Sequence, residues 1–199
     1  GLQTLKAHGP FEILQESLAA TVVSVHKDAL LRSSTARPGD DIVFVMDLDG
    51  YFPELLPRAF VTTEQKSDEL VRAQMEAVAI VAERHLAHSC KDMSNPGDLG
   101  TLGMMLETSG AGGTVDVRLI PIPKDVDPIL WHLAYQGCGF VFACPPEHSE
   151  EIIGLFEEVG CEGAVVGSVD DTRILRITDG RDTEILFDFE KDAITGCRP

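Results

Sequence analysis

The sequence has 199 residues, 44% of them apolar, which is enough for one large domain with a substantial core. Lys and Arg total 16 and Asp and Glu total 33, so the formal net charge is −17, which argues against nucleic acids and anionic membranes as partners. No apolar run approaches the roughly 20 residues of a membrane span and no secretory signal is visible, so we expect a cytoplasmic protein.

The first half of the chain predicts two strands and one long helix. Residues 20–26 (ATVVSVH) and 42–48 (IVFVMDL) are apolar and β-branched, which is typical of buried strands. Residues 27–41 between them form a turn-rich connector. An irregular loop over residues 49–63 follows, and then Ser67 caps a helix over residues 68–88. Residues at helical spacing predict its buried face: Val71, Met75, Val78, Ala82 and His85.

The most informative segment runs from Lys91 to Gly113, KDMSNPGDLGTLGMMLETSGAGG. Asn95 and Pro96 predict the start of a second helix, with Asn as the cap and Pro as the first helical residue. Three glycines at intervals of three residues then lie on one face of that helix: Gly97, Gly100 and Gly103. Each glycine in a helix interior costs about 1 kcal/mol relative to alanine, so the stripe indicates that something approaches the backbone closely.

The rest of the chain predicts alternating strands and helices that end in a strand meander. The expected strands are residues 114–117, 139–144, 164–169, 173–178 and 183–188. The expected helices are residues 127–135 and a segment that opens at Pro145-Pro146-Glu147 and runs to Val159. The pattern indicates an α+β fold, a mixed sheet covered by helices on one side. The five cysteines show no framework or metal-ligand spacing, which favours reduced thiols over disulfides or a zinc site.

Two interpretations of the glycine stripe stay open. It packs tightly against another segment, or it admits a phosphate or other anion to the helix N-terminus, where exposed N–H groups and the dipole favour negative charge. Lys91, Ser94 and Thr101 would add donors to such a site. Asp92 and Asp98 oppose an anion unless they hold a Mg²⁺ ion that mediates the contact.

Three segments together resemble the aminoimidazole ribonucleotide (AIR) synthetase-related family. LLRSSTARPGDDIVFVMDL resembles the junction between its two domains, and KDMSNPGDLGTLGMMLETSGAGGTVDV resembles the glycine-rich segment of the second. GCGFVFACPPEHSEEI with GAVVGSVDD is similar to a later pattern of that domain. Within the family, the Asp-Met-Ser-Asn-Pro-Gly form is most similar to methanogenesis marker protein 2.

The resemblance implies a domain division and a set of site residues. Residues 1–26 would be the remnant of an N-terminal ATP-binding domain or a leader. Residues 27–41 would be the connector, 42–190 the C-terminal synthetase-like domain and 191–199 a mobile tail. The motif carries over onto these positions: Lys91, Asp92, Ser94, Asn95, Gly97, Gly100 and Gly103. Pro96 and a single Gly97 stand where several relatives have two adjacent glycines, which puts direct phosphate contact in question.

The resemblance also implies a function for the parent protein. Family members use ATP, held mainly by the N-terminal domain at a dimer interface, and either transfer phosphate or activate an amide or similar oxygen. We therefore expect this chain to be the substrate-cleft domain of an ATP- and Mg²⁺-dependent enzyme, inactive alone, with no tightly bound cofactor. Its substrate would be a small phosphorylated or carboxylate molecule, and a homodimer is compatible. The alternative is a noncatalytic ligand-sensing or protein-interaction module with the same fold.

Overall fold

The fold is described from a computed structural model for residues 3–6, 14–17 and 30–197. The strand predicted over residues 20–26 lies outside the described residues. The strands are β1 (Gln3–Lys6), β2 (Leu14–Ser17), β3 (Asp41–Met46), β4 (Ala59–Phe60), β5 (Ser89–Asp92), β6 (Gly112–Asp116), β7 (Tyr135–Gln136), β8 (Gly139–Cys144), β9 (Glu162–Asp170), β10 (Ile174–Thr178) and β11 (Thr183–Asp188). The helices are α1 (Asp68–Glu83), α2 (Asp98–Ser109), α3 (Pro128–His132) and α4 (Ser149–Glu157), with 3-10 helices η1 (Val117–Leu119) and η2 (Pro146–His148).

Seven strands form one mixed sheet in the order β11-β10-β6-β9-β3-β8-β5. β10 and β6 run parallel, and the other neighbouring pairs are antiparallel. This confirms the predicted α+β class with a mixed sheet covered by helices. The expected closing meander is wrong, because β6 lies between β9 and β10. The connection from β9 to β10 therefore crosses over β6, and the two strands do not form a hairpin.

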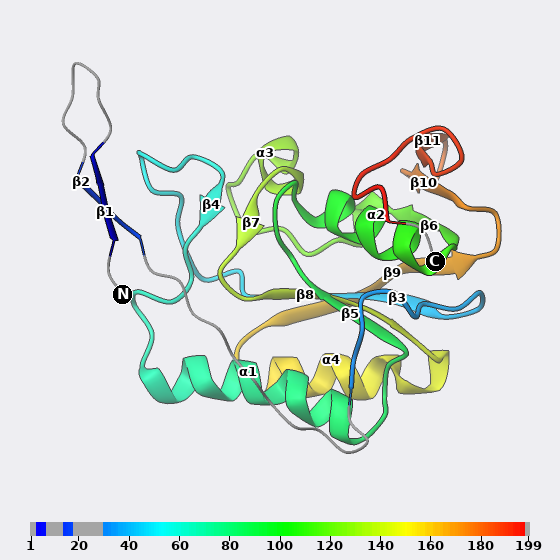
Figure 1. Ribbon diagram of the computed structural model, residues 1–199. Coiled ribbons are helices and arrows are strands. Elements are labelled where there is room, and N and C mark those ends of the chain that lie inside the picture. The colour runs from blue at the N-terminus through cyan, green and yellow to red at the C-terminus, as the bar shows by residue number, and fades with distance from the viewer. Residues whose placement is uncertain (1–2, 7–13, 18–29, 198–199) are drawn as a thin grey trace.

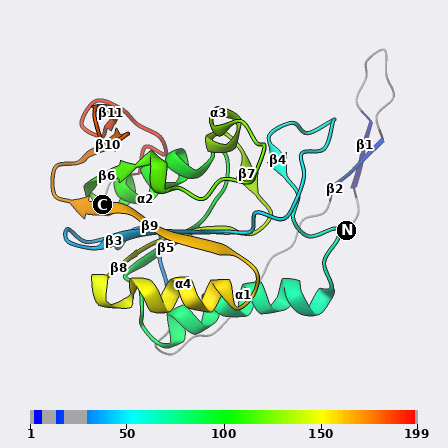
Figure 2. The same ribbon diagram turned by 180° about the vertical axis from the view of Figure 1, so that it is seen from behind.

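Helices cover both faces of this sheet, whereas the sequence suggested only one (Figures 1 and 2). α1 and α4 lie on one face, and α2 lies on the other. The central strand β3 supplies both cores because its side chains alternate: Ile42 and Phe44 face the α2 side, and Val43 and Val45 face the α1 side. A strand buried on both faces reads as a continuous apolar run, which explains the sequence DIVFVM.

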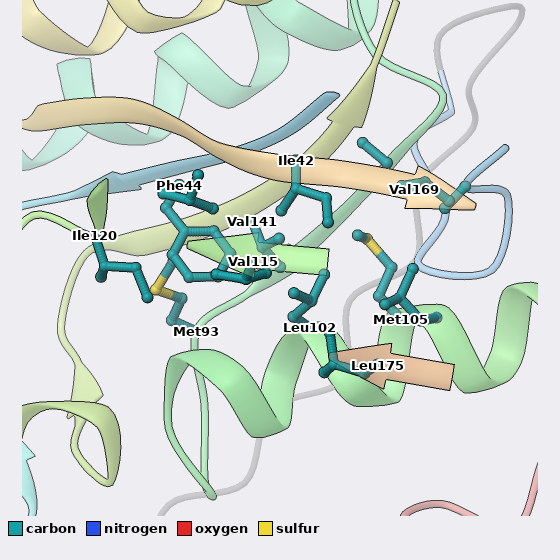
Figure 3. Packing of buried hydrophobic residues seen from close by; sticks show 14 of the residues in the cluster. Ile42, Phe44, Met93, Leu102, Met105, Val115, Ile120, Val141, Val169 and Leu175 are labelled. Carbon is teal, nitrogen blue, oxygen red and sulfur yellow. The ribbon is translucent and has the colours of Figure 1, made fainter. Parts of the chain in front are cut away.

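The core on the α2 side positions the candidate site. Figure 3 shows Leu102 and Met105 of α2 packed toward the sheet residues Phe44, Val115 and Val141. All five side chains are fully buried. The start of α2 is therefore fixed against the sheet by apolar packing as well as by its own hydrogen bonds.

The first long helix ends earlier than predicted. α1 stops at Glu83 because His85 takes a left-handed backbone conformation, with φ 55°. The chain then forms β5, which the sequence did not indicate, since SCKD has no apolar alternation. The buried face of α1 also differs from the prediction: it consists of Gln74, Ala77 and Val81, while Met75 is 45% exposed.

Among the described residues, no helix has both the length and the apolarity that crossing a bilayer requires. The segment expected to be a mobile tail is instead hydrogen-bonded over part of its length. Glu107 of α2 accepts hydrogen bonds from the main-chain N–H groups of Ile194, Thr195 and Gly196, at 3.2, 2.7 and 3.2 Å. Three consecutive amides around one carboxylate fix residues 194–196 against the helix.

Candidate functional site

The candidate site is the loop that joins the edge strand β5 to helix α2. Lys91 and Asp92 end the strand, and Met93 is buried beneath the loop. The N–H of Met93 donates to the carbonyl of Gly139 at 2.8 Å, which extends the pairing with β8 by one residue. The loop therefore starts from a position that the sheet determines.

Two polar groups at this loop are open to solvent. Asp92 and Asn95 are exposed, and Lys91 and Ser94 are half-buried. The Lys91 ammonium group contacts the Asp92 carboxylate and donates to the Asp92 carbonyl at 3.2 Å. These four residues are the predicted site positions that a ligand from outside can reach.

Thr101 is buried and holds the loop instead of facing solvent. The hydroxyl oxygen accepts from the N–H of Ser94 at 3.0 Å and donates to the carbonyl of Ser94 at 3.3 Å. Both bonds go to one residue seven positions earlier, so Thr101 sets the position of the Ser94 main chain. Its geometry is that of a positioning residue.

The space that a side chain would need at each of the three glycines is filled by a different part of the protein. A Cβ on Gly97 would lie 2.0 Å from the His132 carbonyl oxygen, and one on Gly100 would lie 2.4 Å from Pro96 Cγ. A Cβ on Gly103 would lie 2.6 Å from Ile194 Cδ1. The close approach that the stripe indicated is real, and protein atoms make it. Of the two interpretations, tight packing accounts for all three glycines.

The start of α2 also differs from the prediction. Gly97, with φ 95°, is the N-cap and Asp98 is the first helical residue, whereas Asn95 and Pro96 were expected to fill those places. The Asp98 carboxylate is completely buried and accepts from the Leu99 N–H at 2.6 Å. A carboxylate at this end of the helix is favourable because it meets the positive end of the dipole. The Asp98 carboxylate thus lies at the helix N-terminus, where the anion-site interpretation placed a bound phosphate.

A histidine that the sequence analysis did not select completes this cluster. His132 Nδ1 lies 2.9 Å from Asp98 Oδ2, and the His132 side chain is 20% exposed. The two residues are 34 positions apart. Because His132 ends the short helix α3, the pair joins the start of α2 to the end of α3. No spacing in the sequence signals a contact of this kind.

The remaining chemistry around the loop limits what it can do. Burial, with a smaller contribution from the charge of Asp92, raises the pKa of the Cys90 thiol, so this cysteine stays protonated and is a poor nucleophile. In the part of the chain that the structure describes, no group of three or more His, Cys, Asp or Glu side chains could hold a metal ion. Asp92 pairs with Lys91 and Asp98 pairs with His132, so the two predicted Mg²⁺ ligands have separate partners.

Comparison with known proteins identifies relatives over most of the chain. A sequence model described as AIR synthase related protein, C-terminal domain, matches residues 50–180. An uncharacterized protein of Methanocaldococcus jannaschii is 47% identical over 171 residues, which is 86% of this chain and 53% of that protein. An uncharacterized protein of Synechocystis is 24% identical over 168 residues, 84% of this chain and 52% of the relative. The chain spans about half the length of these curated relatives.

Solved structures share the fold at low sequence identity. Phosphoribosylformylglycinamidine synthase II from Thermotoga maritima matches 87% of this chain and 28% of its own, with 19% identity and a TM-score of 0.70. T. maritima PurL complexed with ATP matches 88% of this chain and 28% of its own, with 19% identity and a TM-score of 0.67. The hydrogenase maturation protein HypE matches 85% of this chain and 59% of its own, with 18% identity and a TM-score of 0.59.

Proposed function

This chain belongs to the AIR synthase related protein family, whose C-terminal domain it carries, and on that basis we propose that it forms the substrate-facing domain of an ATP-dependent cytoplasmic enzyme. The reaction would be phosphoryl transfer or ATP-driven activation of an amide or similar oxygen. ATP and Mg²⁺ would be bound mainly by an N-terminal domain of the full-length protein. We take that protein to be similar to methanogenesis marker protein 2 and to act as a homodimer. The structure of T. maritima PurL complexed with ATP supports the nucleotide part of this proposal.

The observation that carries the proposal is a polar loop on a rigid base. Asp92 and Asn95 are exposed and Lys91 and Ser94 are half-buried, while the residues beneath them are buried. Thr101 holds Ser94 by two hydrogen bonds. Catalytic and binding groups need a fixed position, and a loop held in this way provides one. We assign contact with the phosphate or carboxylate of a small substrate to Lys91, Ser94 and Asn95, while Asp92, itself an anion, pairs with Lys91. Their supports are Gly97, Gly100, Thr101 and Gly103.

The residues of this chain do not fit a Mg²⁺ site between Asp92 and Asp98. Asp98 is completely buried and paired with His132, so its carboxylate is not available to an ion that enters from solvent. Mg²⁺ demands near-ideal octahedral geometry and usually keeps several water ligands, and a fully buried carboxylate suits neither requirement. We therefore route no step through a metal at this loop and leave the metal with the N-terminal domain.

The test measures ATP turnover by the full-length protein. Lys91→Gln and Asn95→Ala should each lower kcat/KM about tenfold or more, because each removes a polar contact to substrate. Lys191→Gln is the matched control, since Lys191 also pairs with an aspartate, Asp188, but lies after β11. It should leave kcat/KM unchanged.

Two outcomes would contradict the proposal in different ways. If the full-length protein binds ATP or a phosphorylated ligand without turnover, the noncatalytic sensing module replaces the enzyme. If turnover is normal and neither variant at the loop affects it, the loop serves only to pack α2, and the substrate lies elsewhere.

A further inference from the structure

A second site, away from the glycine-rich loop, lies where α1 ends and the chain enters β5. An open hollow of about 500 Å³ is found there. Its polar lining comes from two separate segments: Arg32, Thr35 and Arg37 precede β3, while His85 and His88 follow α1. The strand β5 lies between this hollow and the candidate loop. Its four residues span about 10 Å from the first Cα to the last.

The lining of the hollow is basic in a strongly acidic chain. Every titratable group that lines it is an arginine or a histidine. The chain as a whole has 33 acidic residues against 16 Lys and Arg. A lining chosen at random would therefore contain more acids than bases. Within the part of the chain that the structure describes, no carboxylate pairs with either guanidinium group, that of Arg32 or that of Arg37.

The arrangement around His88 holds one of these arginines in place. His88 Nδ1 lies 2.8 Å from Asp40 Oδ1, and His88 Nε2 lies 3.0 Å from Arg37 Nη1. A guanidinium group can only donate, so Nε2 accepts, and Nδ1 carries the proton that it donates to Asp40. The Asp40 carboxylate accepts from His88 through Oδ1 and from the main-chain N–H of Arg37 through Oδ2 at 2.9 Å, and it does not line the hollow. The contact uses one of the five N–H donors of Arg37.

The main chain around the hollow is fixed by hydrogen bonds between distant segments. The carbonyl of Arg32 accepts from Ser89 Oγ at 2.8 Å and from the Cys90 N–H at 3.0 Å. Thr35 Oγ1 donates to the carbonyl of His88 at 2.6 Å. The two arginines therefore extend from positions that the sheet edge determines, which reduces the ordering cost of binding a ligand.

The helix end nearby does not cancel this positive charge. α1 ends at Glu83, next to the hollow, and a helix C-terminus carries roughly half a negative charge. Two guanidinium groups outweigh it about fourfold. The charged groups that line the hollow therefore favour an anion.

We propose that this hollow is a phosphate-binding site, in which Arg32 and Arg37 bind the oxygen atoms of a phosphate group. Arginine suits this role because its planar donors match two phosphate oxygens at once. His85 also lines the hollow and adds a further ring N–H donor. The site would take inorganic phosphate or the phosphate of a small ester, and it is independent of ATP turnover at the other loop.

Binding is tested by ³¹P NMR titration of the chain with inorganic phosphate at low salt, followed by a sugar phosphate and by acetate. Arg37→Gln and Arg32→Gln should each weaken phosphate binding about tenfold or more. Arg84→Gln is the matched control: it removes the same charge at the same helix end, but Arg84 is paired with Glu151 and does not line the hollow. It should leave the affinity within about twofold of the parent chain.

The titration separates the site from general electrostatics. Equal losses in all three variants, or no saturable binding, would overturn the proposal, as would acetate binding as tightly as phosphate. Tighter binding of the sugar phosphate than of inorganic phosphate would identify an ester as the ligand. Unfolding curves of the three variants show whether any loss of affinity comes from loss of folded protein. No ATP is present, so failure here says nothing against the proposed enzyme.

Discussion

Two aspartate–histidine pairs stand at the two ends of β5 and use the same contact for different purposes. Asp40 meets His88 before the strand, with 2.8 Å between Oδ1 and Nδ1, and Asp98 meets His132 after it, with 2.9 Å between Oδ2 and Nδ1. In both pairs the histidine is partly exposed and the aspartate is buried. The difference lies in what surrounds them.

The first pair faces an open hollow and contacts an exposed arginine, while the second joins two helices. The second ring nitrogen of His88, Nε2, accepts from the guanidinium group of Arg37, whose side chain is exposed. His132 belongs to α3, whose last carbonyl approaches Gly97 so closely that no side chain fits there. An Asp–His pair is therefore not a functional signature by itself. Its role follows from whether the neighbouring backbone is packed or open.

The largest effect should come from breaking the packed side of this comparison. Gly97→Ala places a Cβ 2.0 Å from the His132 carbonyl oxygen, at a φ of 95° that side chains rarely adopt. Backbone strain and overpacking together should lower the free energy of unfolding by about 4 kcal/mol. Urea denaturation measures this directly.

Gly154→Ala provides the control for that measurement. Gly154 lies within α4, and a Cβ there would meet no atom within 4 Å. Alanine should stabilise the protein by about 0.5–1 kcal/mol, because it favours the helix. Equal and small effects at both glycines would mean that α3 does not press on Gly97, and the packed interpretation of the glycine stripe would be lost.

The two histidines should differ in cost when each is removed. His132→Ala leaves a completely buried Asp98 carboxylate with the Leu99 N–H as its remaining partner, which should cost about 3 kcal/mol. His88→Ala should cost about 1 kcal/mol, because the Asp40 carboxylate keeps the main-chain N–H of Arg37 as a partner at 2.9 Å.

Urea denaturation of both histidine variants under identical conditions gives the difference. A cost for His88→Ala as large as that for His132→Ala would show that the first pair also holds the fold together. The hollow would then be a consequence of packing more than a place prepared for a ligand.

The sequence predicted those elements whose apolar pattern matches their period. The run IVFVM predicted the central strand β3, and GFVFAC predicted β8 with its correct bounds. β5 was missed because its four residues, SCKD, are held by hydrogen bonds and not by apolar side chains: Ser89 is buried with its hydroxyl on the carbonyl of Arg32. Hydropathy patterns do not register burial of this kind.

The site was predictable in part for a similar reason. Three glycines at a spacing of three residues correctly indicated close approach to α2, but spacing does not say which atoms approach. The partners of the stripe come from α3, from Pro96 and from the C-terminal segment. Both Asp–His pairs join residues far apart in the chain, 48 and 34 positions, so they appear only when the fold brings them together.

Another small effect, of the size expected for His88→Ala, should come from a third buried carboxylate, which has main-chain amides and a hydroxyl in place of a histidine. Desolvation acts to raise the pKa of Glu107, but hydrogen bonds from Thr195, Gly196 and Ile194 outweigh it and lower the pKa below the ordinary value of 4.5. A carboxylate with a lowered pKa stabilises the fold when ionised, and that stabilisation is lost as the pH falls through its folded-state pKa. Glu107→Gln should therefore cost about 1 kcal/mol near neutral pH.

The pH dependence of this cost distinguishes an anchor for the tail from a merely buried side chain. The difference between Glu107→Gln and the parent chain should be constant above the unfolded-state pKa of about 4.5. It should shrink below that pH, where the unfolded chain takes up a proton first, and vanish once the pH has fallen through the lower folded-state pKa. Glu157→Gln, at an exposed position at the end of α4, should show no such dependence. A pH-independent difference for Glu107→Gln would mean that the ionised carboxylate contributes nothing beyond its shape, because a protonated glutamate and a glutamine would then hold residues 194–196 equally well.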